Sequence, residues 1–188
     1  MYNIIVLHGT MDNSQSNWFP WFKSKMDFRH KVWIPDLPGS NKPDPRKYTE
    51  FLLKNADRLY DERTVVIGHS SGAVEVLYLL QHMPEHIRIK AGILIGVFKD
   101  RVPKSLQWDA LTDMFPEEFD FEKIKKHAEK IVYIHSDNDP YCPLEHAEYL
   151  MKHTGGELKL FKGYGHFSLS SGIQFSQFPE ILDIIDSL

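Results

Sequence analysis

Short apolar runs alternate along the chain with segments in which apolar residues recur every three or four positions. The six runs are residues 3–7, 31–35, 64–68, 91–96, 130–135 and 157–161. Runs of this length, rich in valine and isoleucine, are typical of strands that are buried on both faces of a sheet. The pattern therefore predicts six strands.

Four of the intervening segments have the apolar spacing of amphipathic helices. They cover residues 46–60, 72–83, 143–152 and 175–188. Strands that alternate with helices form a mostly or wholly parallel sheet with helices on both faces, so we expect a three-layer α/β sandwich whose helices have polar outer faces. Because no internal repeat or linker divides the chain, we expect one domain over residues 1–188.

The longest interval without a clear pattern lies between the fourth and fifth predicted strands, at residues 97–121. It contains five aromatic residues, Phe98, Trp108, Phe115, Phe119 and Phe121. A loop of this length in a compact domain is often functional, so one interpretation is a small lid over a site. The alternative is a loop that its own aromatic side chains hold in place.

The charged residues argue against a nucleic-acid partner. The chain has 22 basic and 26 acidic residues and a formal net charge of -4, with no block of lysine or arginine suited to a phosphate backbone. The basic stretch "KIKKHAEK" around Lys125 has Glu122 and Glu129 nearby, and we interpret it as a solvated helix face.

The apolar runs and the cysteine content indicate a soluble protein. The N-terminal "MYNIIVLHG" lacks the basic region and the long apolar core of a signal peptide, and no apolar run approaches the roughly 18 residues of a membrane helix. The single cysteine, Cys142, cannot form an internal disulfide, which fits a reducing compartment. We therefore expect a cytoplasmic protein without membrane association.

The segment "GHSSG", residues 68–72, has the Gly-x-Ser-x-Gly pattern of a nucleophile elbow centred on Ser70. It follows a predicted buried strand and precedes a predicted helix, which is the context that such a turn requires. Small residues are needed there because the chain reverses sharply and its neighbours pass close together. The alternative is a glycine-rich turn in which Ser70 caps the helix.

A serine nucleophile needs a base and an acid that orients the base, and both are expected downstream in the order serine, acid, histidine. The acid candidates are Asp139 and Asp137, in "HSDNDPYCP" after the fifth predicted strand. We favour Asp139, which precedes Pro140 and can point back across the strand ends, and interpret Asp137 as a turn residue that binds local backbone N–H groups. The base candidate is His166, in the glycine-containing loop "GYGHF" after the sixth strand.

Acyl transfer also needs N–H donors for the oxyanion. The sequence predicts the backbone N–H of Ser71, at the start of a helix, and that of Thr10 in the loop after the first strand, with Gly9 as the alternative to Thr10. Trp18 and His69 are the predicted substrate-binding residues. In the alternative interpretation Trp18 is a core residue and His69 packs beneath the elbow.

A metal site is a weaker interpretation of the acid segment. The sequence "HSDND" offers His135, Asp137 and Asp139 as ligands, but no second histidine-rich cluster supports them. We therefore expect neither a metal nor an organic cofactor.

The segments "VLHG", "NWFPWF", "VWIPDLP", "VIGHSSGA", "SDNDPYCP" and "GYGHF", in this order, resemble the small α/β-hydrolases of the retinoblastoma-binding protein 9 and YdeN-like family. They span nearly the whole chain and are together far more specific than the elbow alone. The resemblance implies a minimal α/β-hydrolase fold without a large cap domain and a triad of Ser70, Asp139 and His166. A retinoblastoma-type interaction is not supported, because Cys142 does not lie in a Leu-x-Cys-x-Glu motif.

The sequence thus predicts a serine hydrolase, esterase-like or peptidase-like, that cleaves a carboxylic ester or amide bond of a small substrate through an acyl-enzyme. Two alternatives remain open. One is a catalytically weak binding protein on a hydrolase scaffold, since a fold does not fix a function. The other is an acyltransferase that uses the same triad with an acceptor other than water.

Overall fold

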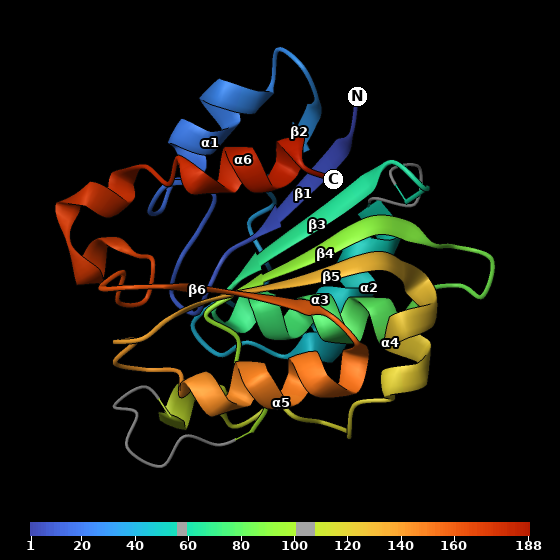
Figure 1. Ribbon diagram of the computed structural model, residues 1–188. Coiled ribbons are helices and arrows are strands. Elements are labelled where there is room, and N and C mark those ends of the chain that lie inside the picture. Colours follow the sequence, from blue (N-terminus) through green and yellow to red (C-terminus); the bar gives the residue numbers. More distant parts are fainter. Residues whose placement is uncertain (56–59, 101–107) are drawn as a thin grey trace.

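The computed structural model describes residues 1–55, 60–100 and 108–188, and its central element is a six-stranded sheet (Figure 1). The strands are β1 (Asn3–Leu7), β2 (Lys31–Trp33), β3 (Thr64–His69), β4 (Ile89–Ile95), β5 (Ala128–Ser136) and β6 (Glu157–Phe161). All neighbouring strands are parallel, in the order β2-β1-β3-β4-β5-β6, so β2 and β6 form the edges. The prediction of six strands in a parallel sheet is confirmed.

Helices cover both faces of the sheet, as expected. They are α1 (Phe19–Met26), α2 (Pro45–Asn55), α3 (Ser71–His82), α4 (Phe121–His127), α5 (Leu144–Thr154) and α6 (Glu180–Asp186). Helices α1 and α6 lie on one face, and α2, α3, α4 and α5 lie on the other (Figure 1).

The helix boundaries differ from the predicted ones in three places. Helix α2 ends at Asn55, and residues 56–59 lie outside the described residues. Helix α6 starts only at Glu180, after a short 3₁₀ turn. The basic stretch "KIKKHAEK" is helical up to His127 and then enters β5 at Ala128.

The inner strands β1, β3 and β4 are buried almost throughout, whereas the edge strands β2 and β6 are partly exposed. Successive side chains of a strand point to opposite sides of the sheet. In β1, Ile4 and Val6 belong to the core beneath α1 and α6, whereas Ile5 and Leu7 belong to the core beneath the other four helices. A continuous apolar run can therefore fill two cores at once.

Helix α3 is the most deeply buried helix and does not have the polar outer face that we expected. All residues from Ser71 to Gln81 are buried. Helices α2 and α4 pack against it in addition to the sheet. The burial includes Glu75, whose carboxyl oxygen accepts a hydrogen bond of 2.7 Å from the hydroxyl of Thr49.

The interval 97–121 includes residues 101–107, which lie outside the described residues, so the predicted lid is not assessed there. The described part is held by aromatic contacts. The ring of Phe115 lies edge-on to Phe98 and to Phe119, and Phe119 in turn contacts Tyr78 of α3. For the described part, the structure thus supports the alternative of a loop held by its own aromatic residues.

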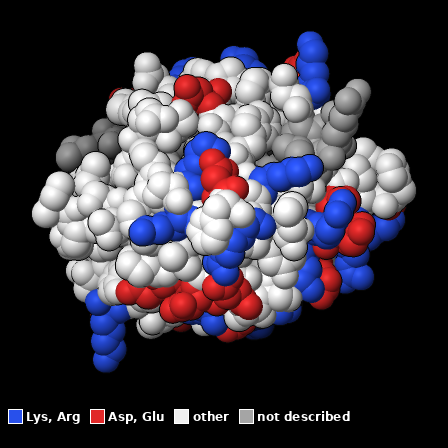
Figure 2. Space-filling view, turned by 90° about the horizontal axis from the view of Figure 1, so that it is seen from above, with Lys and Arg blue, Asp and Glu red and all other residues white. Residues whose placement is uncertain are grey.

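The surface carries charges of both signs. On the face in Figure 2, the described basic and acidic side chains are interspersed with uncharged residues. Within the described ranges, no helix has both the length and the apolar character needed to cross a membrane.

Candidate active site

Ser70 occupies the sharp turn between β3 and α3, in a backbone conformation that few non-glycine residues adopt (φ 56°, ψ -121°). The neighbouring glycines make the turn possible. A Cβ on Gly68 would lie 2.2 Å from the carbonyl oxygen of Gly72, and a Cβ on Gly72 would lie 2.3 Å from that of Leu7. Backbone contact between strand, turn and helix therefore holds Ser70 in a conformation that typically costs about 1–3 kcal/mol.

Ser70 occupies the N-cap position of α3, but its side chain does not cap the helix. Its carbonyl oxygen accepts hydrogen bonds from the N–H groups of Ala73 and Val74, but its side chain makes no capping bond within the described part of the chain. The hydroxyl instead lines a cavity at the carboxyl edge of the sheet.

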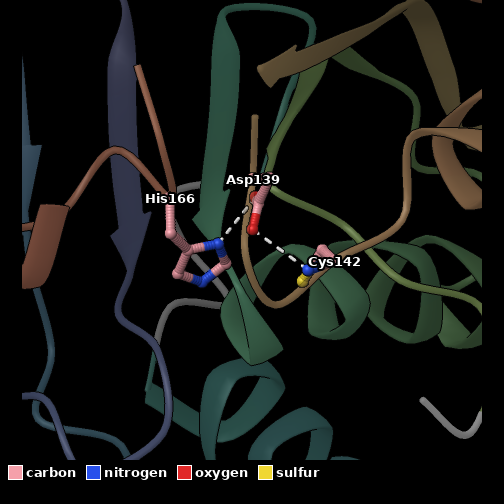
Figure 3. A group of neighbouring side chains, drawn as sticks. All are labelled: Asp139, Cys142 and His166. Carbon is pink, nitrogen blue, oxygen red and sulfur yellow. Dashed lines mark hydrogen bonds and ion pairs between the residues drawn. The ribbon is translucent and has the colours of Figure 1, made fainter. Parts of the chain in front are cut away.

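His166 and Asp139 form a buried pair at the same edge (Figure 3). The Nδ1 of His166 lies 2.8 Å from one carboxylate oxygen of Asp139, and the other oxygen accepts bonds from the N–H groups of Tyr141 and Cys142 at 2.9 and 3.0 Å. Burial raises the pKa of Asp139, but the bond and charge of His166 and the two N–H groups outweigh burial and lower the pKa. The ionised carboxylate can only accept, so Nδ1 holds the proton and Nε2 is left to accept one.

The loop that carries His166 is fixed by three consecutive side chains of the loop that carries Asp139. Side-chain oxygens of Ser136, Asp137 and Asn138 accept hydrogen bonds from the backbone N–H groups of Tyr164, Gly163 and Gly165, respectively. The donor–acceptor distances are 2.8–2.9 Å. The prediction that Asp137 binds local backbone is therefore wrong, because its partner lies 26 residues along the chain. The two loops form one hydrogen-bonded unit.

His69 supports His166 from beneath the elbow. Its Nε2 lies 2.7 Å from the carbonyl oxygen of His166, which can only accept, so Nε2 carries the proton. Burial, and then the charge of His166, lowers the pKa of His69 to about 3, which keeps the ring neutral. His69 lines the cavity but is only 1% exposed, so its observed contact is with His166.

The loop after β1 is oriented by His8. The N–H of Leu37 donates to Nε2 of His8 at 2.8 Å, so the ring proton lies on Nδ1, which donates to the carbonyl of Gly9 at 2.9 Å. Burial lowers the pKa of His8 and favours this neutral form. The Gly9 carbonyl, which His8 fixes, and the N–H of Thr10 belong to the same peptide bond. Because the described peptide bonds are trans, this N–H points away from that carbonyl.

Thr10 and Ser71 lie together beside Ser70. The hydroxyl of Thr10 donates to that of Ser71 at 3.0 Å, and a Cβ on Gly9 would lie 3.1 Å from the Cβ of Ser70. Ser71 is the first residue of α3, where backbone N–H groups have no partner within the helix and the helix dipole favours negative charge. This arrangement can stabilise an oxyanion next to Ser70.

The cavity has a volume of about 360 Å³, near the lower end of the roughly 300–1,000 Å³ that is usual for ligand pockets. Ser70 and His166 are among the residues that line it, and Phe98 and Leu111 contribute apolar walls. The two side chains proposed for proton transfer thus face one small cavity.

Comparison with known proteins places this chain in a family. It matches the serine hydrolase family over residues 4–187. The chain belongs to that family. It is 25% identical to the protein YdeN of Bacillus subtilis over 185 residues, which cover 98% of this chain and 94% of YdeN. It is 23% identical to the serine hydrolase RBBP9 of Rattus norvegicus over 193 residues, which cover 98% of this chain and 93% of RBBP9.

Solved structures agree with the family assignment at the level of the fold. The crystal structure of the ydeN gene product from B. subtilis has a TM-score of 0.89 at 24% identity, over 100% of this chain and 98% of that chain. The serine hydrolase described here therefore has the α/β-hydrolase fold, without a large cap domain among its described residues. It is an enzyme of the serine hydrolase type.

Trp18 is not part of the cavity wall of this hydrolase. Its side chain is 0% exposed and lies edge-on to Phe19, Phe22 and Phe178. The predicted substrate contact is therefore not supported, and the alternative of a core residue describes its position. Apolar spacing alone could not separate a buried aromatic side chain from one that lines a cavity.

Several residues of the site were missed by the sequence analysis, among them Gly96, Tyr141 and Asp12. Gly96 follows β4, has a positive φ of 60°, and leaves room for His166, since a Cβ there would lie 3.0 Å from the imidazole. Tyr141 places its ring edge-on to His166, with centroids 5.1 Å apart, and Asp12 also lines the cavity. The position of Gly96 directly after a strand was the one available signal.

The metal ligands considered in the sequence do not come together. The Nε2 of His135 donates to the carbonyl of Cys142, and Asp137 accepts from Gly163. Within the described ranges, a different set of possible ligands does converge, namely Asp139, Cys142 and His166.

Proposed function

We propose that this hydrolase cleaves carboxylic ester or amide bonds of a small substrate, with Ser70 as nucleophile, His166 as general base and Asp139 as the residue that orients His166. One joint observation carries the proposal. A serine in a strained elbow faces the same cavity as an imidazole whose Nδ1 is bound to a buried carboxylate. A serine hydroxyl becomes a nucleophile when Nε2 of such an imidazole takes its proton, which is the step that we propose for Ser70 and His166.

In the proposed reaction, the Ser70 hydroxyl oxygen attacks the substrate carbonyl carbon while Nε2 of His166 takes the hydroxyl proton. The negative charge that develops on the carbonyl oxygen is stabilised by the N–H groups of Thr10 and Ser71. The bond to the leaving alcohol or amine then breaks, and the imidazolium returns the proton to it. Water repeats the sequence on the acyl-enzyme and releases the acid.

The charge balance of the site supports this role of His166. The ionised carboxylate of Asp139 stabilises the imidazolium that forms in each step. The neighbouring ring of His69, 4.9 Å away between centroids, is kept neutral by burial and therefore adds no competing positive charge.

The size of the cavity supports a small substrate. A volume of about 360 Å³ accommodates a small acyl group against the side chains of Phe98 and Leu111. A series of p-nitrophenyl esters of increasing acyl length, with aminoacyl amides beside it, distinguishes the two bond types. Product analysis with added acceptor alcohols or amines distinguishes hydrolysis from acyl transfer.

A fluorophosphonate probe tests the nucleophile. We expect the wild type to be labelled, Ser70→Ala to be unlabelled, and hydrolysis by Ser70→Ala to fall by about a thousandfold or more. Ser71→Ala is the matched control, because the proposal uses only the backbone N–H of Ser71, and it should stay within about tenfold of the wild type. An unlabelled wild type, or equal labelling of Ser70→Ala, would overturn the proposal.

A further inference from the structure

Cys142 lines the cavity but has no part in the proposed reaction. Its backbone is fixed on both sides, because its N–H donates to Asp139 and its carbonyl accepts from Nε2 of His135. The side chain is buried, at 5% exposure. The fixed backbone and the burial therefore hold the thiol beside the pair of Asp139 and His166 (Figure 3).

The three side chains form a set of ligands that zinc prefers. One potential ligand atom from each of Asp139, Cys142 and His166 lies within 4.8 Å of the other two. Zinc bonds of about 2.0–2.3 Å in a tetrahedral site place ligand atoms roughly 3–4 Å apart, so adjustments of about 1 Å suffice. Cys142 and His166 both line the cavity, which gives an ion a path to the site and leaves the fourth position for water.

A thiol binds zinc as the thiolate, because the charge of the metal deprotonates a coordinated thiol. The sulfur–zinc bond forms as the sulfur–hydrogen bond breaks, and the proton leaves to solvent.

We propose that Asp139, Cys142 and His166 form a Zn²⁺ site, and that zinc bound there switches the hydrolase off. The regulatory part rests on the proposed function. If Nδ1 of His166 binds zinc, the ring proton lies on Nε2, which can then no longer accept a proton from Ser70. If Nε2 binds zinc, the same position is blocked directly. The ion inhibits and is not a cofactor, so the expectation that hydrolysis needs no metal is unchanged.

Cobalt binding tests the site independently of activity. The chain contains one cysteine, so a cobalt–thiolate charge-transfer band on addition of Co²⁺ reports Cys142 alone. We expect the band in the Ser70→Ala variant and no band in the double variant Ser70→Ala/Cys142→Ser. His86 is an exposed histidine in the segment after α3, so His86→Asn should leave the band unchanged. Asp139→Asn is a second variant, which keeps the cysteine and should weaken cobalt binding by about tenfold or more. Absence of the band from Ser70→Ala overturns the site.

Zinc inhibition tests the regulatory part. With metal-buffered Zn²⁺, the wild type should lose more than about nine-tenths of its ester hydrolysis, and a chelator should restore it. Each rate is taken relative to the zinc-free rate of the same variant. Half inhibition of Cys142→Ser should need at least about tenfold more zinc, since even the loss of a residue that only hydrogen-bonds to a metal ligand lowers metal affinity by about tenfold. Equal sensitivity of Cys142→Ser, or a zinc-insensitive wild type, overturns the inference.

The two experiments separate this inference from the proposed function. A wild type that neither labels with fluorophosphonate nor hydrolyses esters, but gives the cobalt band, retains the metal site and rejects the hydrolytic triad. A wild type that hydrolyses esters without a cobalt band and without zinc inhibition retains the triad and rejects the metal site.

Discussion

The elbow that carries Ser70 and the loop that carries His166 meet at one cavity but are held there by different forces. The elbow is fixed by backbone contact, since Gly68 and Gly72 leave no room for a side chain. The loop of His166 is fixed because its backbone N–H groups donate hydrogen bonds to side chains at the end of β5 and in the loop after it, 26–28 residues earlier in the chain. Steric contact tolerates almost no change, whereas hydrogen bonds can be removed one at a time. The positions of Ser70 and His166 should therefore respond differently to mutation.

The largest effect is expected at the elbow. In Gly72→Ala the new Cβ would meet the carbonyl oxygen of Leu7 at 2.3 Å, so β1 and α3 must separate. We expect a loss of about 3 kcal/mol or more in the free energy of unfolding, measured by urea denaturation.

Gly39→Ala is the matched control for that substitution. Gly39 has a positive φ of 75° but nothing within 4 Å of an added Cβ, so only backbone strain of about 1 kcal/mol is expected. If Gly72→Ala cost no more than Gly39→Ala, steric contact would not be what holds the elbow.

A smaller and more selective effect is expected at the other loop. Asn138→Ala removes the acceptor of the Gly165 N–H and of the Ser136 hydroxyl. We expect kcat/KM to fall by about tenfold while the free energy of unfolding falls by about 1 kcal/mol, because the loop loses one anchor rather than its whole fold. Asn138→Asp keeps the acceptor oxygen and should recover most of the activity. A variant that lost stability without loss of kcat/KM would contradict this role.

The contact between the elbow and the loop of His166 should make the free energy of unfolding depend on pH. His69 has a folded pKa of about 3 against an ordinary value of 6.5, so the unfolded chain binds its proton first as the pH falls. The stabilisation is present above about pH 6.5 and is lost towards pH 3, by about 1 kcal/mol per pH unit. His69→Gln keeps a donor for the His166 carbonyl but does not titrate there. Its free energy of unfolding should therefore fall less steeply between pH 6.5 and 4, and parallel curves would reject this explanation.

A pH effect of opposite sign is expected deeper in α3, where Glu75 is fully buried. Burial raises its pKa well above the ordinary value of 4.5, although the bond from Thr49 opposes this. The folded protein thus keeps a proton that the unfolded chain releases, and stability falls as the pH rises above about 4.5. Glu75→Gln keeps the acceptor for Thr49 and should remove this slope, so its free energy of unfolding should exceed that of the wild type by a margin that grows as the pH rises. Glu50→Gln, exposed on α2, should leave the slope unchanged.

The contrast between the two regions also explains what the sequence could predict. The elbow is a local pattern, because the glycines that permit the turn lie two residues from Ser70 on either side. The six strands could also be predicted from local sequence, because each of them is a short apolar run. The order of serine, acid and histidine along the parallel strands was enough to bring Ser70, Asp139 and His166 to one edge, although their catalytic roles stay predictions.

The features that the sequence analysis missed depend on partners distant in the chain. The side chain of Asp137 was predicted to bind local backbone, because the sequence does not show that its partner, Gly163, comes close to it from a different loop. Trp18 was assigned to the cavity because spacing does not show what packs against a buried ring. The expected polar outer face of α3 is absent because α2 and α4 cover that helix. In each case a contact formed only in the folded chain decides the environment.

The position of β6 at the edge of the sheet has a consequence for the native ensemble. Among the strands, β6 pairs only with β5, and it leads directly into the loop of His166. Local opening needs less free energy than global unfolding where fewer neighbours must be released. Detachment of this one edge strand would release His166 from the cavity while Ser70 stays in its elbow. Opening of β6, measured by hydrogen exchange, therefore sets an upper bound on how long the assembled site persists.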